Sequence, residues 1–346
     1  AGHYGTYAFK PKQPLSLLDQ GVDKYTGVFI FLEAHKRNAA QYSAAADQTG
    51  LSRFGDLTPD FILLFVIPLL IILMTYNSFT KERENGTIAL LKSQGVSGIK
   101  LAIGKWIAAM LPIVLITFVL FLLAGIMLSN LTNYGEFSWS SLFVLFGVYL
   151  VYYMIFANIV LVISNFSKNS GIALVSSLTV WILVCFVAPK VASNFADTQY
   201  PYPTKEEFAK SITDEKAQAI NGHNTSSDAA QKLLKEMLVK HNVDSVQKLP
   251  FNFNGYLMQI GEESQAKLYT KHYEILRSQF NNQSKVYRML AAISPFLPTR
   301  FLSMGVARTD YDAHWNFSDA SEKYRIESQR LLNMSMAENS KYGDRG

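Results

Sequence analysis

Four long apolar stretches dominate the middle of the chain and limit what it can fold into. They cover about residues 60–79, 106–128, 141–163 and 171–190. A helix of about 20 apolar residues crosses the roughly 30 Å of hydrocarbon in a bilayer. The Leu, Ile, Val and Phe residues of the second stretch contribute on the order of −4 to −7 kcal/mol to insertion. We therefore predict four transmembrane helices, in preference to buried helices of a soluble core.

The composition differs sharply between the middle of the chain and its two ends. Hydrophobic residues make up 49% of the sequence and charged residues 17%, and the apolar residues are concentrated between positions 60 and 190. The net charge of +5 is not gathered in a dense basic patch, so nucleic acid is not an expected partner. The single cysteine, Cys185, rules out an intrachain disulfide and a cysteine metal site.

Lys and Arg residues indicate how the spans are oriented, because they accumulate in cytoplasmic loops. The loop between the first two spans is basic, the next loop (SNLTNYGEFSWS) has no Lys or Arg, and the third contains Lys168. The basic residues of the first loop are Lys81, Arg83, Lys92, Lys100 and Lys105. We therefore expect the first and third loops in the cytoplasm and both ends of the chain outside it. This topology predicts a further span before Ala1 and another after Gly346.

The chain divides into three predicted regions of a mainly α, polytopic membrane protein. Residues 1–58 form an extracytoplasmic segment, 59–190 a four-span membrane domain with a cytoplasmic loop at 80–105, and 191–346 a mostly helical extracytoplasmic domain. We expect extended structure and turns near the start and then a short helix near residues 31–47. After the linker TQYPYPT, a helix is expected over about 205–220, and a second one begins after a cap at Ser227 or Asp228. Two further helices are expected over about 256–293 and 319–339.

Two prolines and one asparagine lie within the apolar stretches. Pro68 and Pro112 lie within spans, where proline is tolerated because neighbouring helices can satisfy the freed carbonyl groups. Asn158 is the most polar residue deep in the third span. It either forms a hydrogen bond to another helix or lines a pathway, and we favour the structural role.

The sequence offers little for catalysis. The segment GIKLAIGKW resembles a P-loop but has five residues between its glycines, and Trp106 follows Lys105 where Ser or Thr is needed. Any ATP-driven work is therefore expected from another chain. His35 with Glu33 is a weak metal-site candidate, because scattered histidines are mostly structural. His314, Asp310 and Glu322 are the candidates for a membrane-anchored enzyme, a distant alternative, but their spacing matches no known motif. We expect no catalytic residue, no metal and no cofactor.

The first basic loop is the most informative segment. An amphipathic helix is predicted from Thr87, with Ile88 and Leu91 on one face. Gly95 is expected to end it in the left-handed conformation, and Ser97 to cap a short helix that leads into the second span. Such a helix either offers a surface to a cytosolic partner or is a simple interfacial connector. The physical pattern alone does not decide between the two.

This loop resembles the pattern of ABC type 2 exporter permeases. The residues that carry the resemblance are Glu82, Arg83, Glu84, Gly86, Thr87, Leu90, Leu91, Gly95, Val96, Ser97, Gly104 and Lys105. In that family the loop forms a coupling helix that docks on a separate cytosolic ABC ATPase subunit. The resemblance implies the same role here for Glu82, Arg83, Glu84, Gly86, Thr87, Leu91, Gly95 and Lys105.

The polar segments, among them RFGDLTP and SPFLPTRFLSMGVARTDYDAHWNFSDASEKYR, resemble a bacterial subgroup of this family with large extracytoplasmic domains. The subgroup has a span before the first outer segment and one after the second, in agreement with the charge pattern. One departure is ARTD at 307–310, where a glycine is expected before Thr309. The resemblance implies a permease of the bacterial inner membrane, paired with itself or a related permease and in contact with membrane lipid. The alternative is an ABC-coupled mechanical or regulatory envelope protein without cargo.

Overall fold

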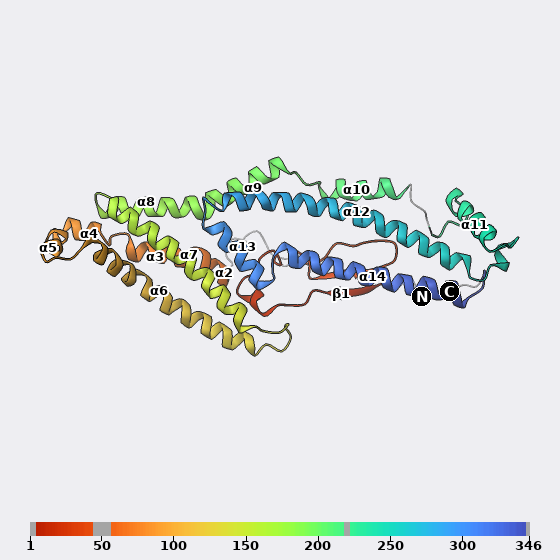
Figure 1. Ribbon diagram of the computed structural model, residues 1–346, viewed down its shortest axis with the longest axis horizontal. Coiled ribbons are helices and arrows are strands. Elements are labelled where there is room, and N and C mark those ends of the chain that lie inside the picture. The colour runs from red at the N-terminus through yellow and green to blue at the C-terminus, as the bar shows by residue number, and fades with distance from the viewer. Residues whose placement is uncertain (1–4, 44–56, 218–221, 344–346) are drawn as a thin grey trace.

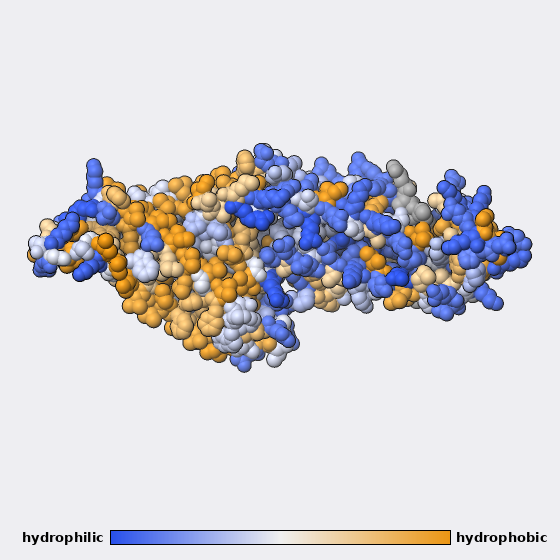
Figure 2. All heavy atoms as spheres, viewed as in Figure 1, coloured by the Kyte–Doolittle hydropathy of each residue, from blue (hydrophilic) through white to orange (hydrophobic). Residues whose placement is uncertain are grey.

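The computed structural model describes residues 5–43, 57–217 and 222–343. The molecule is elongated, with long membrane helices at one end and a helical extension at the other (Figure 1). The visible surface is mainly hydrophobic over the membrane helices and mainly hydrophilic over the extension (Figure 2). The chain is therefore a mainly α, polytopic membrane protein, as predicted.

Four helices are long and apolar enough to cross a membrane, and they coincide with the four predicted stretches. Each is longer than its apolar stretch because polar residues continue the helix at its ends. The first consists of α2 (Pro59–Phe61), the π-helical turn η3 (Ile62–Val66) and α3 (Ile67–Thr75), followed by α4 (Thr80–Glu84). The others are α6 (Gly98–Ser129), α7 (Trp139–Phe166) and the continuous run of α8 (Ser170–Ile182), η4 (Leu183–Val187) and α9 (Ala188–Gln199). The short α5 (Thr87–Ser93) precedes α6.

The extension is built mainly from the C-terminal half of the chain. Its helices are α10 (Lys205–Lys216), α11 (Asp228–Lys240), η5 (Val246–Lys248), α12 (Phe253–Leu290), α13 (Phe296–Ala307) and α14 (Tyr311–Asn339). The N-terminal segment adds β1 (Thr6–Phe9), η1 (Pro14–Leu17) and β2 (Phe29–Leu32). The long helix α12 lies along both α14 and α9 (Figure 1).

The structure confirms the predicted cap of α11 and corrects two other expectations. The Ser227 hydroxyl accepts a hydrogen bond from the Ala230 amide. The short helix expected near 31–47 is wrong in its described part, because Phe31 and Leu32 belong to β2, which pairs with β1, and residues 33–43 are not helical. Residues 44–47 lie outside the described residues. The helix expected from 319 begins at Tyr311, because Asp310 caps it.

Helix α13 was not expected, since the sequence SPFLPT was interpreted only as the end of the long helix. Pro295 is the N-cap of α13 and Pro298 lies in its first turn. The first amides of a helix have no carbonyl partner within that helix, so proline is tolerated there. The two prolines thus separate α12 from α13 without preventing either helix.

Helix α7 forms the centre of the membrane part. Tyr149, Tyr152, Tyr153 and Phe156 of this helix are fully buried. The helix packs against α3, α6, α8 and α13. Every other membrane helix therefore depends on α7 for part of its packing.

Two tyrosines of α7 repair the backbone where Pro68 interrupts the first span. Proline has no amide hydrogen, so it leaves carbonyl groups of the preceding turn without a helical partner. The Tyr152 hydroxyl donates to the Leu64 carbonyl and the Tyr153 hydroxyl to the Leu63 carbonyl, each at 3.0 Å. The expectation that neighbouring helices satisfy the freed carbonyls is thus confirmed at Pro68.

The fourth membrane helix has the same arrangement. Pro189 follows the π-helical turn η4, and the Ser294 hydroxyl donates to the Val184 carbonyl at 2.8 Å. Ser294 lies between α12 and α13, so this contact also ties the extension to the membrane helix. Unsatisfied backbone groups are costly in hydrocarbon, which makes both repairs important for the fold.

A buried ionic cluster fastens the N-terminal segment and α13 to the start of the first span. Arg300 Nη1 lies 2.9 Å from Asp19 and 2.7 Å from Asp60. The Ser303 hydroxyl donates to Asp19 and lies 2.9 Å from the Tyr149 hydroxyl. Burial raises the pKa of Asp19, while Arg300 and Ser303 oppose this shift. Removal of one partner from such a buried pair typically costs about 3–5 kcal/mol.

The turn at the end of α13 explains why a glycine is expected before Thr309. Arg308 has a φ of 57° and a ψ of 39°, in the left-handed region that glycine adopts without strain. The Thr309 amide donates to the Met304 carbonyl at 2.9 Å, and the Thr309 carbonyl accepts from the Val22 amide at 2.8 Å. The turn therefore ends the helix and also holds the N-terminal segment.

Substitution of Tyr153 by Phe is expected to destabilise the membrane part by about 1 kcal/mol, because the Leu63 carbonyl loses its donor. Thermal unfolding of the full chain in detergent measures the change. Tyr324→Phe is the matched control, since Tyr324 is 62% exposed. Equal stability of the two variants would contradict the proposed backbone repair.

Arg308→Gly is expected to stabilise the protein by about 1 kcal/mol, because a side chain in the left-handed region costs roughly that amount. Arg308→Ala keeps the Cβ atom and is expected to give no such gain. The same unfolding measurement compares both variants with the natural protein. A gain with alanine equal to that with glycine would assign the effect to the arginine side chain instead of the backbone.

Candidate functional site

The predicted coupling loop lies at the end of the membrane part that is farthest from the extension (Figure 1). Helix α5 begins at Thr87 as predicted, and Ile88 and Leu91 are half-buried. Gly95 has a φ of 80°, and the Val96 amide donates to the Leu91 carbonyl, which closes the expected C-terminal cap. Gly86 also has a positive φ, 72°, and forms the N-cap of α5.

Ser97 caps the next helix as predicted, accepting a hydrogen bond from the Lys100 amide at 3.3 Å. The helix that follows is not a separate short one, because it continues from Gly98 without a break into the second span. The loop is therefore connected to that span by rigid helix.

Glu82 joins three helices of this region. Its carboxylate lies 2.8 Å from Lys105 Nζ on α6 and accepts a hydrogen bond from the Thr87 hydroxyl at the start of α5. Glu82 itself belongs to α4. Both charged side chains are about one-quarter exposed, so the ion pair contributes at most about 1 kcal/mol. Its main effect is to orient α5 relative to α6.

Arg83 and Glu84 join the loop to the turn between α7 and α8. The Arg83 guanidinium donates to the carbonyl groups of Ser167 at 2.6 Å and Asn165 at 2.7 Å. The Glu84 carboxylate accepts hydrogen bonds from the Ser170 amide at 2.7 Å and the Ser170 hydroxyl at 2.8 Å. A carboxylate at the N-terminus of a helix such as α8 is electrostatically favourable.

The charged triplet Glu82, Arg83 and Glu84 therefore contacts other parts of this chain. Sequence reasoning did not identify Ser170 as a partner of Glu84. Its only local signal is its position at the start of the fourth span. These contacts position the loop against α6 and against the turn between α7 and α8.

An exposed apolar side chain lies on α5 between the triplet and the second span. Leu90 is 58% exposed, and Ile99, just after Ser97, is 74% exposed. We call these two residues the apolar tip. Leu91 is half-buried and therefore presents less surface. The apolar tip is the part of the loop that is most suitable for binding a partner.

Asn158 lines a cavity of about 790 Å³ between α5, α6 and α7. Arg83, Lys92 and Trp106 line the same cavity. The function of Asn158 stays a prediction.

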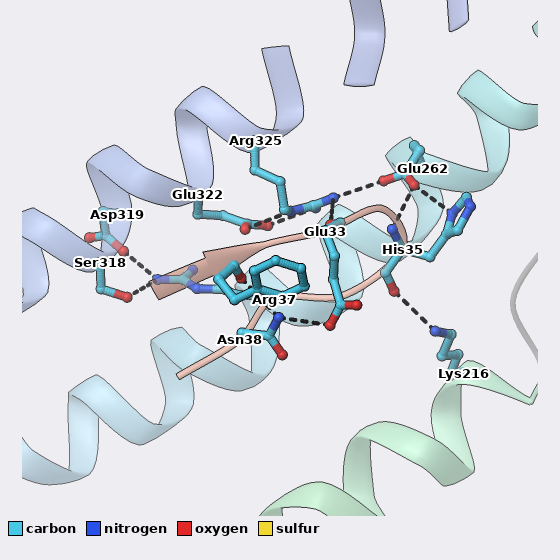
Figure 3. A network of polar contacts seen from close by, with 11 residues as sticks. Glu33, His35, Arg37, Asn38, Lys216, Glu262, Ser318, Asp319, Glu322 and Arg325 are labelled. Carbon is cyan, nitrogen blue, oxygen red and sulfur yellow. Dashed lines mark hydrogen bonds and ion pairs between the residues drawn. The ribbon is translucent and has the colours of Figure 1, made fainter. Parts of the chain in front are cut away.

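The residues considered for a metal site belong to a network that attaches the N-terminal segment to α12 and α14 (Figure 3). His35 Nδ1 lies 2.5 Å from the Glu262 carboxylate, and Arg325 Nη1 lies 3.0 Å from it. Glu33 accepts a hydrogen bond from the Asn38 amide at 2.8 Å. His35 and Glu33 thus take part in different structural contacts. Burial opposes ionisation of Glu262, but His35 and Arg325 outweigh it and lower its pKa to about 2.

The three residues considered for an enzyme are also engaged separately. Glu322 pairs with Arg325 at 2.8 Å, and Asp310 accepts a hydrogen bond from the Ala313 amide at 2.9 Å. His314 is half-buried, and desolvation lowers its pKa to about 4. The contacts of Glu322 and Asp310 therefore give these two residues structural roles.

Comparison with protein families identifies both parts of the chain. Residues 33–198 match the family described as ABC-2 family transporter protein, and residues 205–345 match a domain of unknown function, DUF3526. No curated protein matches the chain. With its four candidate spans, the chain is a multi-pass membrane protein of the transporter class. The match over its membrane part supports a permease component of an ABC transporter.

The network around Glu262 predicts a loss of stability in acid. The pKa of Glu262 is about 2 in the folded protein and about 4.5 in the unfolded chain, so its contribution is complete above pH 4.5 and is lost as the pH falls towards 2. This difference in pKa corresponds to about 3 kcal/mol in the free energy of unfolding. Glu262→Gln is expected to be less stable at pH 7 and to lose less between pH 4.5 and 2, as measured by denaturant unfolding. An unchanged pH dependence would contradict the ion pairing.

Proposed function

We propose that the chain is the membrane-spanning permease subunit that couples ATP hydrolysis by a separate ABC ATPase subunit to transport across the bacterial inner membrane. The ATPase docks on the loop formed by α4 and α5. The observation that carries this proposal is the geometry of that loop. It lies at the free end of the membrane part, its charged triplet binds it to neighbouring helices, and its apolar tip is exposed.

The contacts of the triplet provide a route for movement. Glu82 connects the loop to α6 through Lys105, while Arg83 and Glu84 connect it to the turn between α7 and α8. A displacement of α5 by the ATPase therefore acts on the second, third and fourth spans together. Helix α8 continues through η4 into α9, which packs on α12 of the extension. Movement at the loop can thus be transmitted along the whole molecule.

The charge pattern supports an orientation with the α4–α5 loop in the cytoplasm and the extension outside. The loop carries Lys81, Arg83, Lys92, Lys100 and Lys105, in agreement with the preference of basic residues for the cytoplasmic side. Residues 1–58 and 191–346 are then extracytoplasmic. A second permease, either another copy or a related chain, completes the transporter.

A mechanical or regulatory role without cargo is the second candidate function. The 38-residue helix α12 favours it, because this helix packs along α9 and α14 and leads through Ser294 back to the membrane part. Such a helix can transmit movement to a partner in the envelope. Accumulation of cargo in sealed inverted vesicles, driven by ATP, separates the two functions.

Leu90→Asp is expected to reduce recovery of the ATPase subunit with the tagged permease about tenfold, since burial of this leucine is worth roughly 1.4 kcal/mol in the interface. Affinity purification from native membranes and quantification of the bound ATPase measure the effect. Leu331→Asp is the matched control, because Leu331 is 64% exposed on α14 in the extension.

Normal recovery and normal ATPase activity with Leu90→Asp would contradict docking at the apolar tip. Glu84→Arg adds an independent arm to the same experiment. It removes the contacts with Ser170, so we expect a displaced loop and weaker docking while the spans stay folded. Loss of the folded permease in this variant would instead make the triplet a determinant of stability.

A further inference from the structure

The cavity between α5, α6 and α7 has a composition that points to a ligand. Its walls are largely apolar and include Leu101, Ile103, Leu161 and Val162. Two cationic residues, Arg83 and Lys92, also line it, and no Asp or Glu is among the described lining residues. Its volume is about 790 Å³. The cavity is therefore suited to a ligand that is apolar at one end and negatively charged at the other.

The cavity is placed where its charged and apolar walls can meet the surface and the interior of a bilayer. Asn158 and Phe166 both line it and lie a little over two turns apart on α7, which is about 12 Å along the helix. The cavity thus extends from the end of the third span well into its hydrophobic part. Ile103 and Val162 are 54% and 56% exposed, so the apolar wall is accessible from the side where a bilayer surrounds the spans.

Both cationic side chains carry N–H groups that can donate hydrogen bonds to a ligand. Arg83 gives one hydrogen bond to Ser167 and one to Asn165, both to backbone carbonyl groups, and a guanidinium has further N–H groups. Within the described parts of the chain, neither Arg83 nor Lys92 forms an ion pair with a carboxylate, in contrast to Lys105, which pairs with Glu82. A positive charge at the membrane surface attracts anionic lipid by about 1 kcal/mol.

We propose that this cavity binds an anionic glycerophospholipid. The phosphate group lies between Arg83 and Lys92, and an acyl chain lies along Ile103 and Val162. A zwitterionic lipid carries a compensating cation and binds more weakly. The bound lipid contacts α5 and α6 together and so supports the position of the loop. This inference goes beyond the proposed function, because lipid binding does not require the ATPase.

The test is a titration of the purified full chain in detergent with phosphatidylglycerol or phosphatidylcholine, in which native mass spectrometry counts the bound lipids. We expect tighter binding of phosphatidylglycerol. Lys92→Gln is expected to weaken it about fivefold, the equivalent of about 1 kcal/mol. Lys100→Gln is the matched control, since it removes the same charge from the same region but Lys100 does not line the cavity. Ala102→Trp, which places a bulky side chain in the cavity, is expected to weaken specific binding.

Three results would overturn the proposal. Equal binding of the two lipids by the natural protein would remove the role of charge. Equal losses in Lys92→Gln and Lys100→Gln would indicate general attraction to the surface. A dimer that excludes lipid and is weakened by Ala102→Trp would assign the cavity to a second copy of the chain. Because no ATPase is present, these outcomes are independent of whether the apolar tip docks a partner.

Discussion

The structure depends on the requirement that every backbone polar group within hydrocarbon has a partner. Pro68 and Pro189 each violate this requirement inside a membrane helix, and each follows a π-helical turn. The repair comes from side chains of other elements, namely Tyr152 and Tyr153 of α7 at the first site and Ser294 at the second. These hydrogen bonds tie the first membrane helix to α7 and the fourth to the segment between α12 and α13.

The same helices carry the polar contacts that connect the two ends of the molecule. At one end, Arg83 and Glu84 hold the α4–α5 loop against the turn between α7 and α8. At the other end, Arg300 holds Asp19 and Asp60 together beside α7. The membrane part is thus a packed unit with polar attachments at both ends. This arrangement is suitable for passing a movement from the loop to the extension.

Local features of the candidate site were predictable from the sequence. The start of α5 at Thr87, the left-handed cap at Gly95 and the N-cap at Ser97 depend on residues only a few positions apart. The partners of the charged triplet were not predictable. Ser170 follows Glu84 by 86 positions, and a serine at the start of a span gives no signal that it binds a distant glutamate. Likewise, β2 replaced an expected helix because pairing with β1 overrode the local preference.

The sequence by itself determined the four membrane helices, since insertion into a bilayer depends on the summed hydrophobicity of each segment. It also determined the caps and turns, which result from the chemistry of adjacent residues. Only the tertiary structure decided that Arg300 binds Asp19, 281 positions away, and that Tyr153 serves a carbonyl group 90 positions away. Such pairs arise from the way helices pack, because many arginines and tyrosines in the chain have the same chemistry and only their positions in space distinguish them.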